Sequence, residues 1–138
     1  MGSAEKGTGM SFAAGDELPP FVVESVSPEA MKEWAQFLAD PNRIHLDPEV
    51  VKAKGLGDRV INQGPINVAY MMNMLLLAFP QGRIESMATR FLANVYGGEK
   101  VVARGHVVSV DGGRHTCELI LESAERGVVC SASATVLG

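Results

Sequence analysis

The stretch that decides the fold is GPINVAYMMNMLLLAF, residues 64–79. It is apolar on nearly every side, so a helix formed from it must be buried around most of its circumference. Pro65 suits the first position of that helix, and Pro80 ends it. The sequence therefore predicts one long hydrophobic helix at the centre of the molecule.

The chain after this helix has the pattern of β-strands. An extended run over 86–96 leads to a Gly97-Gly98 turn, and three further runs, 99–110, 115–123 and 128–137, are separated by turn glycines. In the last run, small and apolar side chains alternate on one face, which lets a helix lie close to it: Val128, Cys130, Ala132, Ala134 and Val136. This pattern predicts an α+β architecture, in which an antiparallel sheet curls around the central helix.

The chain before the central helix contains two shorter helices. Phe21–Val23 reads as a strand, and Ser27-Pro28 then supplies the cap and first residue of a helix that ends near Ala39. One face of that helix is expected to be buried: Met31, Trp34, Ala35 and Leu38. Asp47-Pro48 repeats the signal and opens a short helix that stops at Gly55. Residues 40–47 between them are expected to form an ordered loop.

The composition indicates one globular domain over residues 18–138, preceded by a flexible tail over 1–17. Of 138 residues, 46% are hydrophobic and 20% are charged, which is ordinary for a globular protein. The net charge of −4 disfavours binding to nucleic acid or to anionic membranes. The N-terminus lacks the apolar segment of a signal peptide, and no apolar stretch is long enough to span a bilayer, so a cytoplasmic protein is expected.

Two cysteines, Cys117 and Cys130, show no metal-ligand spacing. We expect them to be reduced thiols in the core, and we expect no metal site.

The loop DPNRIHLD, residues 40–47, carries the chemistry of the sequence. It places a carboxylate, Asp40, and an imidazole, His45, where a turn can bring both onto one small molecule such as water. Such a pair can orient the water, take its proton during attack and return a proton to a neighbouring carbon. The alternative is a turn-stabilising aspartate with a surface histidine.

At this loop the sequence resembles the MaoC-like family, which includes the (R)-specific enoyl-CoA hydratases and has the hotdog fold. The family motif is approximately Asp-x-Asn-Pro-(Ile/Leu)-His-x-Asp, and residues 40–47 have each of its polar members at the same spacing. The resemblance extends over most of residues 20–137. It implies that Asp40 and His45 are catalytic and that Asn42 fixes the turn.

The same resemblance implies that the amide of Gly64 holds the thioester oxygen of a substrate. An amide at the start of a long helix can stabilise negative charge there, although a glycine can also serve backbone freedom alone. Two departures from the family lie near the substrate, where Arg43 replaces a proline and Gln63 replaces a histidine. Arg43 is either a contact for a substrate carboxylate or phosphate, or a solvated arginine.

The resemblance implies reversible hydration of trans-2-enoyl thioesters to 3-hydroxyacyl thioesters, with an acyl-CoA or acyl-carrier-protein substrate and no cofactor. Single hotdog domains usually pair, so a homodimer or a heterodimer with another hotdog chain is expected. Two alternatives stay open: a hotdog thioesterase, and a non-catalytic acyl-binding subunit.

Overall fold

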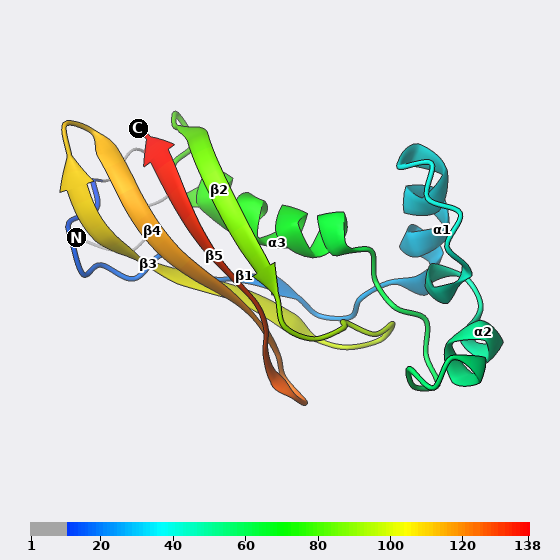
Figure 1. Cartoon of the computed structure of the whole chain (residues 1–138). Helices are drawn as coiled ribbons and strands as arrows, with labels where there is room; N and C mark the ends of the chain where they lie inside the picture. The colour runs from blue at the N-terminus through cyan, green and yellow to red at the C-terminus, as the bar shows by residue number, and fades with distance from the viewer. Residues whose placement is uncertain (1–10) are drawn as a thin grey trace.

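One antiparallel sheet and one long helix make up the body of the molecule (Figure 1). The computed structural model describes residues 11–138. The elements, in chain order, are β1 (Phe21–Val23), α1 (Pro28–Phe37), the 3-10 turn η2 (Arg43–His45), α2 (Pro48–Ala53), α3 (Gly64–Ala78), β2 (Arg83–Phe91), β3 (Val101–Asp111), β4 (Arg114–Ser123) and β5 (Gly127–Leu137). The predicted α+β architecture with a central helix is confirmed.

The five strands lie in the order β1-β3-β4-β5-β2, and every neighbouring pair is antiparallel. The β3–β4 and β4–β5 hairpins turn at the predicted glycines. β2 pairs with β5 and not with β3. Residues 92–100 therefore pass β5 and β4 to connect the edge strand β2 with β3. β2 also runs from Arg83 to Phe91, earlier than the predicted 86–96.

α3 packs on one face of the sheet through Met71, Met74, Leu75 and Ala78, all buried. A small residue of β3, Gly105, permits a close approach of α3; the same role for the small residues of β5 stays a prediction. At Gly105 of β3, an added Cβ would lie 2.6 Å from the Leu119 side chain and 3.1 Å from the Met74 methyl carbon, closer than carbon atoms pack. The glycine therefore lets helix and sheet meet without a gap.

The opposite side of α3 is uncovered in the single chain. Met72, Leu76 and Leu77 are 36%, 46% and 62% exposed. The prediction that α3 is enclosed around most of its circumference is therefore wrong for one chain, because the sheet covers only one side of the helix.

α1 and α2 lie beyond one end of the sheet (Figure 1). Of the predicted buried face of α1, only Met31 is buried; Trp34 and Leu38 are 38% and 36% exposed. That prediction is wrong because α1 packs against η2 and neighbouring loops and not across the sheet. The helix ends at Phe37, two residues earlier than expected.

The ordered chain begins earlier than predicted. Phe12 is buried, the Gly15 amide donates to the Val107 carbonyl, and Leu18 pairs with Gly105. Residues 12–17 are therefore part of the packed domain and not of a tail, while residues 1–10 of the predicted tail lie outside the described residues. Within the described part of the chain, no helix is long and apolar enough to cross a membrane.

Candidate active site

The turn after α1 orients the carboxylate of Asp40. Ala39 adopts the left-handed conformation, with a φ of 52°, and the Asp40 amide donates to the Ala35 carbonyl at 2.9 Å. One oxygen of Asp40, Oδ1, accepts the Asn42 amide at 3.1 Å, and Oδ1 of Asn42 accepts the Ile44 amide at 3.2 Å. The first of these two Asx-type turns holds one carboxylate oxygen of Asp40 and leaves the other available.

The second oxygen of Asp40 meets the imidazole of His45. Oδ2 lies 3.2 Å from Nε2, with the His45 side chain 9% exposed and the Asp40 side chain 32% exposed. The loop thus brings the two predicted catalytic residues into direct contact, and the carboxylate side of the pair reaches the surface.

The other ring nitrogen of His45, Nδ1, is held by a backbone carbonyl. Nδ1 lies 2.6 Å from the carbonyl oxygen of Ile61, and a carbonyl can only accept, so Nδ1 carries a proton. Nε2 then contacts the Asp40 carboxylate favourably only when a second proton lies between the two atoms. In this arrangement the pair holds one transferable proton.

Ile61 belongs to the segment that leads into α3. Its amide donates to the Ile44 carbonyl at 2.9 Å. Both the amide and the carbonyl of Ile61 are therefore hydrogen-bonded to the η2 turn. Gly64, three residues later, is the first residue of α3, and its amide has no acceptor within the helix. Pro65 has no N–H, so the Gly64 amide is the first donor at this helix end.

The two departures from the family motif lie in different surroundings. The Arg43 side chain is 68% exposed and its Nη2 lies 2.9 Å from Oδ2 of Asp47. The Gln63 side chain is wholly buried, and its Nε2 donates to the Met31 carbonyl at 2.9 Å. In this chain Arg43 therefore has an intramolecular partner, and Gln63 ties the start of α3 to α1; substrate contacts for either stay a prediction.

A buried polar cluster beside Gly64 was not predicted. Nδ2 of Asn62 donates to Oδ1 of Asn67 at 2.8 Å and to the Tyr70 hydroxyl at 3.4 Å, and both asparagines are buried. Burial raises the pKa of Tyr70, and the hydrogen bond from Asn62 partly offsets the rise. The signal for this cluster was a pair of asparagines in an otherwise apolar stretch.

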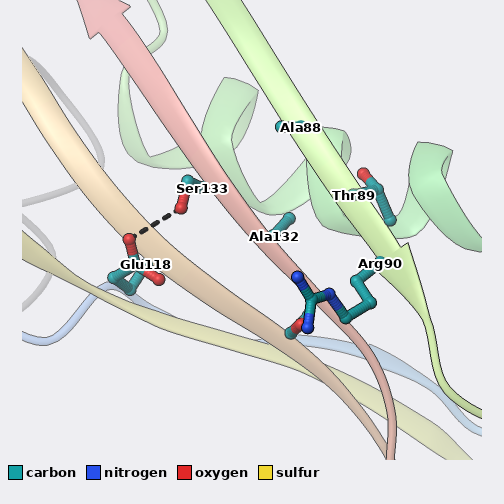
Figure 2. A pocket seen from close by; sticks show the side chains of 7 residues that line it. Ala88, Thr89, Arg90, Glu118, Ala132 and Ser133 are labelled. Carbon is teal, nitrogen blue, oxygen red and sulfur yellow. Dashed lines mark hydrogen bonds between the residues drawn. The ribbon is translucent and has the colours of Figure 1, made fainter.

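A hollow of about 270 Å³ lies elsewhere, on the sheet. Figure 2 shows the Arg90 side chain extending from β2 toward β5, and a hydrogen bond from Ser133 of β5 to Glu118 of β4. Neither Asp40, His45 nor Gly64 lines it. The hollow is therefore separate from the Asp40–His45 pair.

The comparisons with known proteins agree with the fold. No curated protein matches the chain. The (R)-hydratase from A. caviae involved in PHA biosynthesis is similar in structure, with a TM-score of 0.83 and 18% identity over 92% of this chain and 97% of that one. The ChsH1-ChsH2 complex from Mycobacterium tuberculosis gives a TM-score of 0.82 and 19% identity over 92% and 98%. These structures show that the fold is the predicted hotdog fold.

The HadBC 3R-hydroxyacyl-ACP dehydratase complex from Mycobacterium tuberculosis is also similar, with a TM-score of 0.76 and 18% identity over 93% of this chain and 98% of that one. The family described as "MaoC like domain" matches residues 13–126. This match includes the Asp40–His45 loop, the whole of α3 and most of the sheet. The chain therefore belongs to the MaoC-like family, as its sequence motif indicated.

Proposed function

We propose that this protein catalyses the reversible addition of water to a trans-2-enoyl thioester, giving a 3-hydroxyacyl thioester. The observation that carries the proposal is the contact between Oδ2 of Asp40 and Nε2 of His45 at 3.2 Å, in a family of hydratases and dehydratases. The acyl carrier, coenzyme A or a carrier protein, is part of the substrate.

The pair has the groups that both proton transfers need. In the hydration direction, Asp40 accepts a proton from the attacking water as its oxygen bonds to the β-carbon. His45 gives the proton on Nε2 to the α-carbon, and the proton on Asp40 then returns to Nε2. Because donor and acceptor lie side by side, both additions occur on one face of the double bond.

The Gly64 amide stabilises the oxygen of the enolate-like intermediate. Negative charge builds on the thioester oxygen as water attacks the conjugated system, and the N-terminus of α3 favours a negative charge. This role also fits the absence of an intrahelical acceptor for that amide.

A second hotdog chain is part of the proposal. β2 is hydrogen-bonded only to β5 among the described strands, so its outer edge is free, and Leu76 and Leu77 of α3 are exposed. An open strand edge and exposed leucines are both features that proteins normally cover. We propose that a second copy, or a related hotdog chain, covers it.

The test is hydration of crotonyl-CoA and longer enoyl-CoA substrates by the purified protein, followed as loss of the conjugated enoyl absorbance, with thiol release measured in parallel. Loss of absorbance without free thiol supports the hydratase. Thiol release would replace the proposal with a thioesterase, and tight binding of acyl-CoA without turnover would replace it with a non-catalytic subunit.

A further inference from the structure

The loop that crosses from β2 to β3 is built around a buried carboxylate, Glu99. We infer that Glu99 is a positioning residue for His45: it shapes the loop 94–99, which in turn fixes the Ile61 carbonyl that holds the imidazole. The expected effect of Glu99 on kcat rests on the proposed function. Its expected effect on the His45 ring rests on the geometry alone.

Glu99 is wholly buried and satisfied on both oxygens. Oε1 accepts the Tyr96 amide at 2.8 Å and Nη2 of Arg126 at 2.7 Å. Oε2 accepts Nε of Arg126 at 3.1 Å and the Ser123 hydroxyl at 2.8 Å. Three of these four hydrogen bonds join the loop to the β4–β5 hairpin, and the fourth, from the Tyr96 amide, lies within the loop.

These bonds determine the charge state of Glu99. Burial raises the pKa of its carboxyl, but the hydrogen bonds from Arg126, the Tyr96 amide and Ser123 together lower it below the ordinary value. Since Glu99 is charged at neutral pH, the bonds are charge-assisted and stronger than bonds between neutral groups.

Loop 94–99 forms backbone hydrogen bonds with the segment that leads to α3. The Asn62 amide donates to the Val95 carbonyl at 2.7 Å, and the Gly97 amide donates to the Val60 carbonyl at 2.8 Å. Ile61, between the two bonded residues, forms a β-bridge with Tyr96. Tyr96 is the residue whose amide Glu99 accepts, so one chain of contacts runs from Glu99 through Tyr96 to Ile61 and His45.

The same loop holds the lead-in to α1. The Gly98 amide donates to the Val26 carbonyl at 2.7 Å, and the Val26 amide donates to the Glu99 carbonyl at 2.8 Å. Val26 precedes the Ser27 cap of α1, the helix whose far end carries Asp40. Both halves of the pair are thus attached to the loop that Glu99 shapes.

The ring of Tyr96 adds a lateral restraint. The guanidinium carbons of Arg126 and Arg59 lie 5.0 and 5.5 Å from its centroid, within the range of cation–π contacts. Its hydroxyl donates to the Leu56 carbonyl at 2.5 Å. The loop is therefore held both from the sheet and from the chain after α2.

Loosening this loop should change the position of the His45 ring, an effect that a general loss of stability would not produce. If the loop relaxes, the Ile61 carbonyl moves away from Nδ1 of His45, so the Nδ1 proton loses its acceptor and the ring is no longer held in one orientation. Displacements on the order of 1 Å at a reacting group cost about 100-fold in rate. A loosened loop should therefore lower kcat and leave KM nearly unchanged.

The experiment compares Glu99→Gln with two control variants. Val136→Ala removes buried volume at the far end of β5, and Glu85→Gln breaks the exposed pair with Arg114, whose two hydrogen bonds measure 2.8 and 3.0 Å. The ¹⁵N shifts of the His45 ring are recorded in each folded protein and assigned with His45→Gln. Hydration kinetics and Tm are measured alongside.

We expect the ring shift of a hydrogen-bonded Nδ1–H of His45 in the wild type and in both controls, and averaged ring shifts in Glu99→Gln. The kcat of Glu99→Gln should fall by about tenfold to 100-fold, beyond any loss in Val136→Ala at a similar Tm. Unchanged ring shifts in folded Glu99→Gln would overturn the inference, even for a protein that does not hydrate enoyl thioesters. If Glu99→Gln does not fold, Arg126→Gln replaces it under the same criteria, because it removes two bonds to the carboxylate and the contact with Tyr96.

Discussion

Nδ1 of His45 and the carbonyl oxygen of Ile61 lie 2.6 Å apart, and this contact determines what the Asp40 pair can do. It places a proton on Nδ1, so Nε2 is the nitrogen that exchanges a proton with Asp40 or substrate. The acceptor is a backbone atom of a segment 16 residues away in the sequence. The reactivity of the loop therefore depends on a part of the chain outside the motif.

Asp40→Asn should lower kcat for hydration by about 100-fold to 10,000-fold, because the amide cannot take a proton from water. The fold should survive, since an Asn side-chain oxygen can still accept the Asn42 amide. Enoyl absorbance gives the rate and thermal unfolding gives Tm. Asp47→Asn is the matched control; it changes a carboxylate in the same loop that caps α2 and should retain most of the activity. Full activity in Asp40→Asn would reject the assignment.

Arg43→Glu should affect neutral and carboxylated enoyl thioesters to a similar degree. The guanidinium of Arg43 is bonded to Asp47 and largely exposed, so its charge is already partnered and screened. Rates for a neutral and a terminally carboxylated substrate of equal length provide the measurement. A selective loss for the carboxylated substrate, beyond about tenfold, would instead make Arg43 a contact for a substrate anion.

The sequence predicted the residues of the candidate site that lie in one loop, but not the contacts that distant parts of the chain make with that loop. The sequence predicts Asp40, Asn42 and His45 because the family motif has these side chains at the same spacing, and because the turn that they form is local. The Ile61 carbonyl has no side-chain signature. Glu99 follows two glycines in what resembles an exposed turn, yet it is buried and bonded to Ser123 and Arg126 of the β4–β5 hairpin.

The same distinction explains the fold predictions. Strand alternation in β5 gave the buried face from Cys130 to Val136, but Val128 is 41% exposed and Val129 is buried. A register shift between Leu121 and Glu122 changes the pairing there, and such a bulge reverses which side chains point inward. The pairing of β2 with β5 depends on how the chain crosses the sheet, which no local pattern records.

Stability should fall on acidification in a way that depends on Glu99. Its pKa in the folded protein is lowered from an ordinary 4.5, so its stabilising effect is present above about pH 4.5 and is lost as the pH falls through the lower folded value. Tm measured between about pH 6 and pH 3 should fall more steeply for the wild type than for Glu99→Gln. At pH 7 the variant should be less stable by about 1–3 kcal/mol. Parallel curves for the two proteins would contradict this prediction.

Cys117 and Cys130 should resist alkylation in the folded protein. Burial raises the pKa of each thiol to about 11, and the charge of Glu118 adds to the effect at Cys117. At pH 8 only about one thiol in a thousand is then ionised, and the thiolate is the reactive form. Mass spectrometry after iodoacetamide treatment should show no adduct in buffer and two in urea. Adducts on the folded protein would mean that the strands beneath α3 open readily.

Leu76→Asp combined with Leu77→Asp should dissociate the proposed dimer. These two side chains are 46% and 62% exposed in the single chain, on the side of α3 that the sheet does not cover, and a buried carboxylate at such an interface costs several kcal/mol. Sedimentation velocity at micromolar concentration should show a dimer for the wild type and a folded monomer for the variant. Val110→Asp is the control, since Val110 is 41% exposed on β3, and it should leave the dimer intact. A monomeric wild type would contradict the homodimer, and co-expression with candidate hotdog partners would then test the heterodimer.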